Sequence, residues 1–325
     1  MALLNIIMAL NQTLHQQFAK DETLIAFGED VGAFGGVFRV TQGLQKTFGK
    51  QRCFDTPLCE QGIAGFAIGL AEYGFKPVAE IQFADYIFPA YDQIVNELAK
   101  LRYRTGNQYA APMVIRTPYG GGIHGGHYHS QSPEAQFLHT PGLVVVVVSS
   151  PYDAKGLLTS ALRSQDPVLF FEPKRIYRSL KEEVPEEDYE IPLGKAHLAR
   201  IGNDLTLLGW GAQHHQNMQA AEELFKEEGI DVEVINLRTL NPLDVNTLIA
   251  SVKKTGRCVI AHEAPRRMGF GAEIAATLQE SCFLSLEAPI ARCCGYDTPF
   301  PNTLEHLYLP DAPRVKHAVL DTLRY

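Results

Sequence analysis

The sequence predicts an α/β protein with two domains, of which the second is the smaller. In the first half, short β-branched runs alternate with longer small-residue or amphipathic stretches, and the same alternation resumes in the second half. Such alternation implies parallel strands covered by helices on both faces. Between the halves, residues 174–192 carry many charges and two prolines, a pattern typical of a solvated linker. We therefore expect domains at 1–180 and 195–325, joined by a linker at 181–194.

The first domain is expected to begin with a buried helix, because Leu3, Ile6, Ile7, Leu10 and Leu14 recur at helical spacing. Strands are then expected at Thr23–Phe27, Arg52–Phe54, Pro77–Ile81, Met113–Arg116, Leu143–Val148 and Val168–Phe171. Helices are expected between them at Gly62–Tyr73, Pro89–Tyr103 and Tyr152–Arg163. The five consecutive valines at 144–148 suit a central parallel strand that is buried on both faces.

The second domain repeats the pattern with fewer elements. Strands are expected at Asp204–Leu208, Asp231–Asn236 and Cys258–Ala261, and helices at Gln213–Glu228, Asp244–Lys253, Gly271–Gln279 and Ala312–Leu323.

Composition excludes several classes of function. The chain has 325 residues, 46% hydrophobic and 20% charged, so it can bury a sizeable core. Its formal net charge of −8 argues against nucleic acid or a membrane as the main partner. The apolar start, residues 1–10, is too short to span a bilayer and lacks a basic flank. We expect a cytoplasmic protein, or a mature mitochondrial one without a targeting segment. The six cysteines form no Cys-x-x-Cys pair and are expected to be buried thiols in a reducing compartment.

The first candidate functional cluster is the segment 56–62, Thr-Pro-Leu-Cys-Glu-Gln-Gly. Glu60 lies where a predicted strand has ended and a Gly/Ala-rich helix begins, and ligands of open parallel sheets bind at such ends. The alternative is a helix-start carboxylate that binds the free amides of its own first turn.

A second cluster lies at residues 80–90, where polar side chains stand between aromatic ones at a strand end. This combination can hold a flat heterocycle, although a packed strand end has the same pattern.

The third cluster, residues 120–134, contains five glycines and His124, His127 and His129. Histidines in a mobile loop are suited to acid–base chemistry near neutral pH. A metal site is a rival, but no carboxylate or cysteine follows at the usual ligand spacing. A purely structural loop is the third interpretation.

These clusters, in this order, resemble the β-subunits of the thiamine-diphosphate-dependent 2-oxoacid dehydrogenases, the branched-chain type in particular. The resemblance runs from about residue 4 to the end. It is carried by the motifs at 28–31, 56–62, 80–97, 128–134, 171–174, 262–265 and 295–301.

The resemblance implies a pyrimidine-binding domain of the thiamine-diphosphate-binding fold and a C-terminal transketolase-type domain. It implies an α2β2 heterotetramer with thiamine diphosphate at each α–β interface and magnesium held by the α-subunit. The Gly-Asp-Gly motif that binds the diphosphate through magnesium in the α-chain is absent here. It also implies docking to a dihydrolipoyl acyltransferase core through the subunit-binding domain of that core.

The resemblance also assigns roles to residues. Glu60 would hydrogen-bond the pyrimidine ring and so activate the cofactor, and Leu58, Gln82 and Tyr86 would contact the aminopyrimidine. His129 would act in reductive acylation of the lipoyl group. Glu29 would belong to a polar passage between the paired cofactors.

The family can carry a structural potassium ion in this subunit. The matching residues are Ala111, Met113, Val114, Ala161, Ser164 and Asp166, mostly through their carbonyl oxygens.

The reaction implied is oxidative decarboxylation of a branched-chain 2-oxoacid with acyl transfer to a lipoyl arm. A pyruvate or acetoin dehydrogenase β-subunit is the alternative in the same class, since the segments 102–106 and 150–157 also occur in pyruvate-type chains. A non-catalytic scaffold subunit and a self-contained metal enzyme built on the histidine loop are alternatives of other classes.

Overall fold

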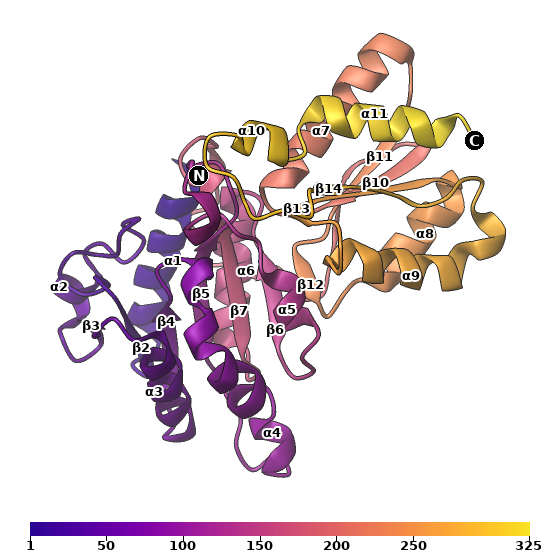
Figure 1. Cartoon of the computed structure of the whole chain (residues 1–325). Coiled ribbons are helices and arrows are strands. Elements are labelled where there is room, and N and C mark those ends of the chain that lie inside the picture. Colours follow the sequence, from indigo (N-terminus) through magenta and orange to yellow (C-terminus); the bar gives the residue numbers. More distant parts are fainter. The chain divides into compact units, whose positions relative to one another are not determined.

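The computed structural model describes residues 1–325, and its chain divides into two compact units (Figure 1). The first unit contains residues 1–119 and 136–193, and the second contains 120–135 and 194–325. Both are built on mostly parallel sheets with helices, which confirms the predicted α/β class. The segment 120–135 was expected in the first domain, but its contacts assign it to the second unit.

The sheet of the first unit is entirely parallel. Its strands are, in spatial order, β6 (Val144–Val147), β7 (Val168–Pro173), β5 (Val114–Tyr119), β4 (Lys76–Glu80), β2 (Leu24–Gly28) and β3 (Cys53–Asp55). The valine run was expected in the centre, but within this unit β6 lies at one end of the order. Its side chains from Val145 to Val147 are nevertheless fully buried. An unbroken apolar run reports burial of both faces, not the number of strand neighbours.

Helices cover this sheet. α1 (Ile6–Lys20) packs against α6 (Pro151–Arg163), while α3 (Glu60–Glu72) packs against β4, and α2 (Leu44–Phe48) lies beside β3. The N-cap residues Asn5 and Ser150 begin α1 and α6, because each side chain accepts a hydrogen bond from an amide of the first turn.

The single regular helix expected at 89–103 does not form. The chain instead makes 3-10 turns at Ala84–Tyr86 and Phe88–Ala90, a π-helical turn at Gln93–Leu98 and a short α4 (Leu101–Arg104). The amide of Ala99 donates to the carbonyl of Ile94 at 3.0 Å, so the turn holds one extra residue. Hydrophobic spacing alone does not reveal such an insertion.

The acidic segment expected to be a solvated linker instead packs on the first unit. β8 (Glu182–Val184) pairs antiparallel with β1 (Ala2–Leu4). The amine of the buried Lys155 donates to the carbonyls of Pro185 at 2.7 Å and Glu186 at 3.0 Å. The charged side chains of the segment indicated exposure, whereas its backbone is bound by the domain. Two further short elements of the chain are α5 (Glu134–Leu138) and a 3-10 turn at Lys174–Ile176.

The second unit has a five-stranded sheet whose strand order is β14 (Ala291–Gly295), β13 (Cys258–Pro265), β10 (Leu205–Gly209), β11 (Val232–Asn236) and β9 (His197–Arg200). Only β9 runs antiparallel to its neighbour. α7 (Ala212–Glu228) and α11 (Ala312–Leu323) cover one face, and α8 (Val245–Thr255) and α9 (Phe270–Cys282) cover the other (Figure 1). The second alternation is therefore confirmed. Shorter elements are β12 (Thr239–Asn241), α10 (Glu305–Tyr308) and 3-10 turns at Gly126–Tyr128 and Phe283–Ser285.

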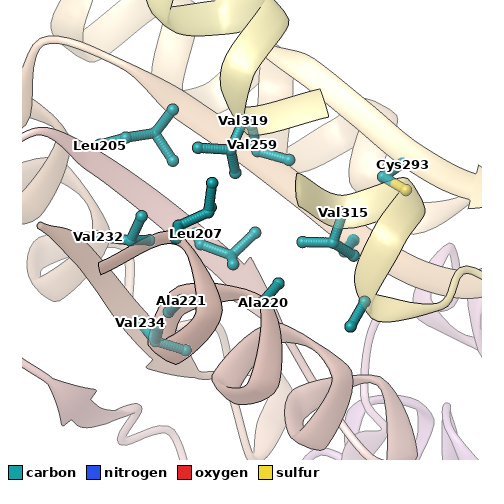
Figure 2. Close-up of a cluster of buried hydrophobic side chains, with 13 residues drawn as sticks. Leu205, Leu207, Ala220, Ala221, Val232, Val234, Val259, Cys293, Val315 and Val319 are labelled. Carbon is teal, nitrogen blue, oxygen red and sulfur yellow. The ribbon is translucent and has the colours of Figure 1, made fainter. Parts of the chain in front are cut away.

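One hydrophobic core of this unit lies between the sheet and the helix pair α7 and α11 (Figure 2). Leu207 and Val234 of the strands meet Val315 and Val319 of α11, all fully buried. Each such side chain contributes about 1.5–3 kcal/mol by leaving water. Five of the six cysteines are buried as expected, but Cys59 is exposed, and none forms a disulfide.

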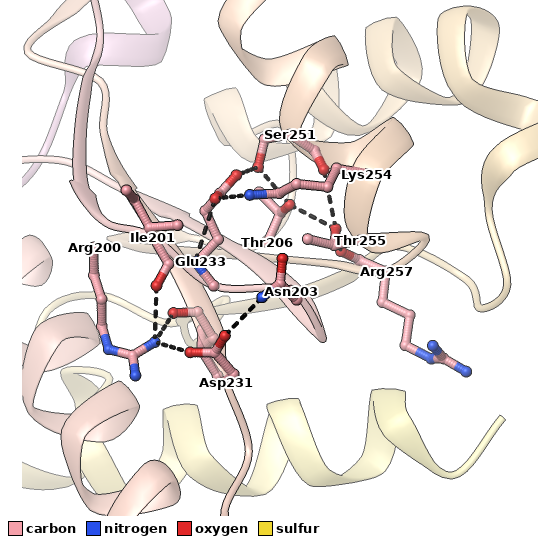
Figure 3. A network of polar contacts seen from close by, with 12 residues as sticks. Arg200, Ile201, Asn203, Thr206, Asp231, Glu233, Ser251, Lys254, Thr255 and Arg257 are labelled. Atoms are coloured by element: carbon pink, nitrogen blue, oxygen red, sulfur yellow. Dashed lines mark hydrogen bonds and ion pairs between the residues drawn. The ribbon is translucent and has the colours of Figure 1, made fainter.

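A buried polar network fastens α8 to the same sheet (Figure 3). The carboxylate of Glu233, on β11, accepts hydrogen bonds from Ser251 at 2.5 Å and from Lys254. Thr206 of β10 bonds Ser251 at 2.7 Å and Thr255 at 2.8 Å. All but Lys254 are buried, so the paired polar groups fix the helix register without an unsatisfied charge.

No helix is long and apolar enough to cross a membrane.

Candidate active site

Several predicted residues lie at the carboxyl edge of the first unit's sheet. Glu29 follows β2, Glu60 follows β3 at the start of α3, and Gln82 and Tyr86 follow β4. Because β3, β2 and β4 are parallel neighbours, their carboxyl ends meet at one edge.

Glu60 and Glu29 are two buried carboxyl groups that interact electrostatically. Each is only 8% exposed. Burial raises the pKa of Glu29 above its usual value, and the charges of Glu60 and then Asp30 raise it further. The Oε1 atom of Glu29 is buried without a hydrogen-bond partner. Two buried carboxyl groups, one with a free acceptor atom, form a site suited to binding a hydrogen-bonding ligand.

Glu60 does not cap its own helix. It is the first residue of α3, yet the turn is closed by the Ile63 amide donating to the Cys59 carbonyl at 2.9 Å, and no first-turn amide donates to the Glu60 carboxylate. Glu60 is thus the acidic residue of the first turn of α3, as the helix-start interpretation expected, but it makes no capping hydrogen bond there.

Tyr86 lies near the same pair. Burial raises the pKa of its hydroxyl, and the charges of Asp85, Glu29 and Glu60 raise it further, in that order. The Gln82 amide donates to Asp30 at 3.3 Å, one residue from Glu29. The structure thus brings Glu29, Glu60, Tyr86 and Gln82 to one edge of the sheet.

Leu58 differs from these four in its exposure. Its side chain is 79% exposed in this chain, on the segment that leads into α3.

A fully buried charge cluster lies below this edge, and sequence reasoning did not assign it a role. The Arg116 guanidinium, on β5, forms a two-pronged bond to Glu172 at 2.7 and 2.9 Å and reaches Glu80 at 2.8 Å. The Tyr177 hydroxyl donates to Glu172 at 2.6 Å. Burial alone would lower the pKa of Arg116, but the two carboxylates outweigh it and raise that pKa. A signal was present, because a charge inside a buried strand requires a buried partner.

His129 lies in the second unit, on the segment 120–135. It is half-buried, and its neighbours have separate contacts: the His124 Nδ1 lies 3.2 Å from the Asn302 carbonyl, and the His127 ring packs on Tyr128 at 4.0 Å. No group of three or more His, Cys, Asp or Glu residues in the chain is placed to hold a metal ion. The metal alternative for this loop therefore lacks a ligand set.

The structure brings together the two segments matched to a potassium site. Residues 111–113 lead into β5 and 161–166 lead from α6 to β7, and β5 pairs with β7. The carbonyls of Ala111 and Ala161 already accept backbone hydrogen bonds, and the Asp166 carboxylate binds Arg102 at 2.7 Å. The potassium site stays a prediction.

A cavity of about 1200 Å³ in the second unit contains none of the predicted residues. It runs beside β14 and is lined by Arg266, Arg292 and Arg314 among others.

Comparisons with known proteins agree with these features. Residues 3–179 match the pyrimidine-binding domain of transketolase, and residues 194–315 match the transketolase C-terminal domain. A solved structure, "Split gene transketolase, inactive beta4 tetramer", shares the fold with a TM-score of 0.78 and 22% identity, covering 99% of each chain. The chain is therefore a two-domain protein of the transketolase class.

More similar relatives narrow the class. The chain is 58% identical to the mitochondrial "2-oxoisovalerate dehydrogenase subunit beta" of Dictyostelium discoideum over 99% of this chain and 87% of that protein. It is 57% identical to the mitochondrial "2-oxoisovalerate dehydrogenase subunit beta 2" of Arabidopsis thaliana, over 99% of this chain and 90% of that protein. It is 49% identical to the "Pyruvate dehydrogenase E1 component subunit beta" of Staphylococcus epidermidis, covering all of both. The chain belongs to the family of 2-oxoacid dehydrogenase β-subunits, and the resemblance seen in its motifs is confirmed.

Proposed function

We propose that this chain is the β-subunit of a thiamine-diphosphate-dependent branched-chain 2-oxoacid dehydrogenase. It would act with an α-subunit, in an α2β2 assembly, to decarboxylate a branched-chain 2-oxoacid oxidatively and transfer the acyl group to a lipoyl arm. The observation that carries the proposal is the Glu60 carboxylate, which is buried beside Glu29 and bonded to nothing in its own helix.

The residues at this edge fit thiamine diphosphate. When bound, that cofactor supplies the carbanion chemistry, and the protein orients and tunes it. Glu60 would hydrogen-bond the pyrimidine ring, because its carboxyl group is buried at the start of α3 and makes no hydrogen bond to its own helix. Gln82 and Tyr86 would orient the ring, and Leu58 would exclude water from it. The partnerless Oε1 of Glu29 supports a role in a polar passage.

His129 is proposed to serve the second half of the reaction. In reductive acylation the acyl group bonds to one sulfur of the lipoyl disulfide, the S–S bond breaks, and the other sulfur leaves as a thiolate that must take a proton. The half-buried imidazole of His129 would supply that proton. We expect His129→Ala to impair acyl transfer to lipoyl more than decarboxylation measured with an artificial acceptor. Equal losses in the two assays would remove this role from His129.

The partners follow from the same proposal. Magnesium and the diphosphate would be held by the α-subunit, because this chain lacks Gly-Asp-Gly. The second unit would dock the subunit-binding domain of a dihydrolipoyl acyltransferase core. A potassium ion between residues 111–114 and 161–166 would compete with Arg102 for Asp166, so carbonyl oxygens would supply most of its ligands.

The substrate assignment is supported by the higher identity to 2-oxoisovalerate dehydrogenase subunits, 58% and 57%, than to a pyruvate dehydrogenase subunit, 49%. One or two methylenes in a pocket change the binding free energy by only about 1–3 kcal/mol. Residues of the α-subunit would also line the pocket and so would contribute to the preference for one 2-oxoacid. The test is decarboxylation of 3-methyl-2-oxobutanoate and pyruvate, with and without a co-expressed α-subunit. We expect activity only with α and a preference for the branched substrate. A preference for pyruvate would move the substrate assignment to the alternative, and activity without α would contradict the proposed cofactor position.

A further inference from the structure

The histidine loop, defined as residues 120–135, is fastened at both ends by buried carboxyl groups of the second unit. At its start, the Gly121 amide donates to Oε2 of Glu263 at 3.1 Å. At its end, Glu134 accepts a hydrogen bond from Nε1 of Trp210 at 3.0 Å. Glu263 is 6% exposed and Glu134 is 1% exposed. Carboxyl groups that accept from backbone or indole N–H donors in a buried interior make geometrically demanding contacts.

The fit at the start of the loop leaves no free space. A Cβ atom on Gly120, whose φ is +77°, would lie 2.7 Å from Oε2 of Glu263. One on Gly121 would lie 2.8 Å from the Phe300 ring and 2.9 Å from a Leu309 methyl. The loop backbone is therefore seated directly on the carboxylate, and only glycine permits this approach.

Hydrogen bonds within the loop connect the segment at Gly121 to the residues that flank His129. The amide of Gly120 donates to the carbonyl of Gln131 at 3.0 Å, which ties the two sides of the loop together. The side-chain amide of Gln131 donates to the carbonyl of His127 at 2.6 Å. A shift of the loop at Glu263 would thus move the residues on either side of His129.

A third carboxylate holds the middle of the loop. Glu305, which begins α10 and is 4% exposed, accepts a hydrogen bond from the His124 amide at 3.1 Å. The loop is rich in glycine, yet the second unit holds it at three points, through the amides of Gly121 and His124 and the side chain of Glu134.

We propose that Glu263 is a positioning residue for acyl transfer, holding the histidine loop so that His129 keeps its working position. The inference rests on the proposed function, because it gives Glu263 a role that acts through His129. Glu134 and Trp210 form the second anchor of the same loop.

The test uses the assembled α–β protein and measures two rates, decarboxylation with an artificial acceptor and acylation of a lipoyl domain. Glu263→Ala removes the acceptor for Gly121, and we expect acylation to fall on the order of 10²-fold while decarboxylation changes much less. Glu263→Gln retains an acceptor oxygen and is expected to recover most of the loss. The matched control is Glu233→Ala, a buried carboxylate of the same unit that is bonded to Ser251 and Lys254 and not to the loop. It is expected to change both rates alike.

Two further measurements separate positioning from general damage. In a His129→Ala background, Glu263→Ala is expected to add little further loss of acylation, because both act through one residue. Amide hydrogen exchange of residues 120–135 is expected to accelerate in Glu263→Ala and not in Glu233→Ala. Full additivity, equal losses in both rates, or unchanged exchange would each overturn the proposal. If the assembly fails to decarboxylate any 2-oxoacid, the proposed function fails, while the exchange result still reports separately on whether Glu263 holds the loop.

Discussion

The two units stabilise their buried acidic groups in opposite ways. In the first unit, Glu80 and Glu172 share the guanidinium of Arg116. In the second, the Glu134 carboxyl group accepts from the indole N–H of Trp210 and from its own backbone amide but has no cation beside it, and the neighbouring charge is that of Glu263. Burial, with a contribution from Glu263, raises the pKa of Glu134 to about 7. The first cluster is thus an ion pair network around one guanidinium, whereas the carboxyl group of the second has no cation beside it and a pKa raised to about 7.

The largest loss of stability is expected when the Arg116 cluster of the first unit is broken. Arg116→Met leaves two carboxylates buried without a cation, and removing one partner of a buried pair costs about 3–5 kcal/mol. Chemical denaturation of the variant measures this loss in the free energy of unfolding. A loss below about 1 kcal/mol, the value of an exposed pair, would show that the cluster does not stabilise the first unit as a buried ion pair network.

The next effect tests the titration of Glu134. Its folded pKa of about 7 exceeds the ordinary value of 4.5, so the folded state holds the proton more tightly. Stability from this group is complete below pH 4.5, falls as pH rises from 4.5 to 7, and stays low above 7. The difference of about 2.5 pKa units corresponds to roughly 3 kcal/mol.

Glu134→Gln isolates that effect from all other titrating groups. The free energy of unfolding of the variant, compared with that of the parent chain, should improve by roughly 3 kcal/mol between pH 4.5 and pH 7.5. A difference between the two proteins that does not change with pH would mean that Glu134 titrates normally.

A smaller effect sharpens the same comparison. Trp210→Phe keeps a ring beside His262 but removes the donor to Glu134. Since hydrogen bonds to charged groups are worth about 1.5–3 kcal/mol and neutral ones about 0.5–1.5 kcal/mol, the variant should lose more stability at pH 8 than at pH 5. Thermal unfolding at the two pH values measures this difference, and equal losses would contradict a charged acceptor at pH 8.

Much of this organisation was predictable from the sequence. Alternation of strands and helices predicted both sheets, and the order of the motifs predicted the family. The strand-end positions of Glu60 and of the cluster at 80–90 were predicted separately, and their meeting at one edge follows in the structure because β3, β2 and β4 are parallel neighbours.

The remainder depends on contacts between distant segments, which local pattern does not encode. The partners of Arg116 lie 36 and 56 residues away, and the contact between Gly121 and Glu263 spans 142 residues. The packing of the acidic segment on Lys155 follows from hydrogen bonds to residues about 30 positions away. The π-helical turn at Gln93–Leu98 is local, but its extra residue is not visible in the hydrophobic spacing. Hydrophobic spacing had predicted one regular helix at 89–103, and the charges had predicted a solvated linker at 174–192; both predictions were wrong.

The measurement that tests the central claim most directly compares Glu60→Gln with the parent chain, each assembled with the α-subunit. Oxidation of 3-methyl-2-oxobutanoate would be followed with an artificial acceptor, and assembly would be checked by size. Glutamine has the same shape but cannot exchange the proton, so we expect intact assembly and a rate lower by about 10²–10⁴-fold. An unchanged rate in an intact assembly would contradict the assignment of Glu60, and with it the site proposed at this edge of the sheet.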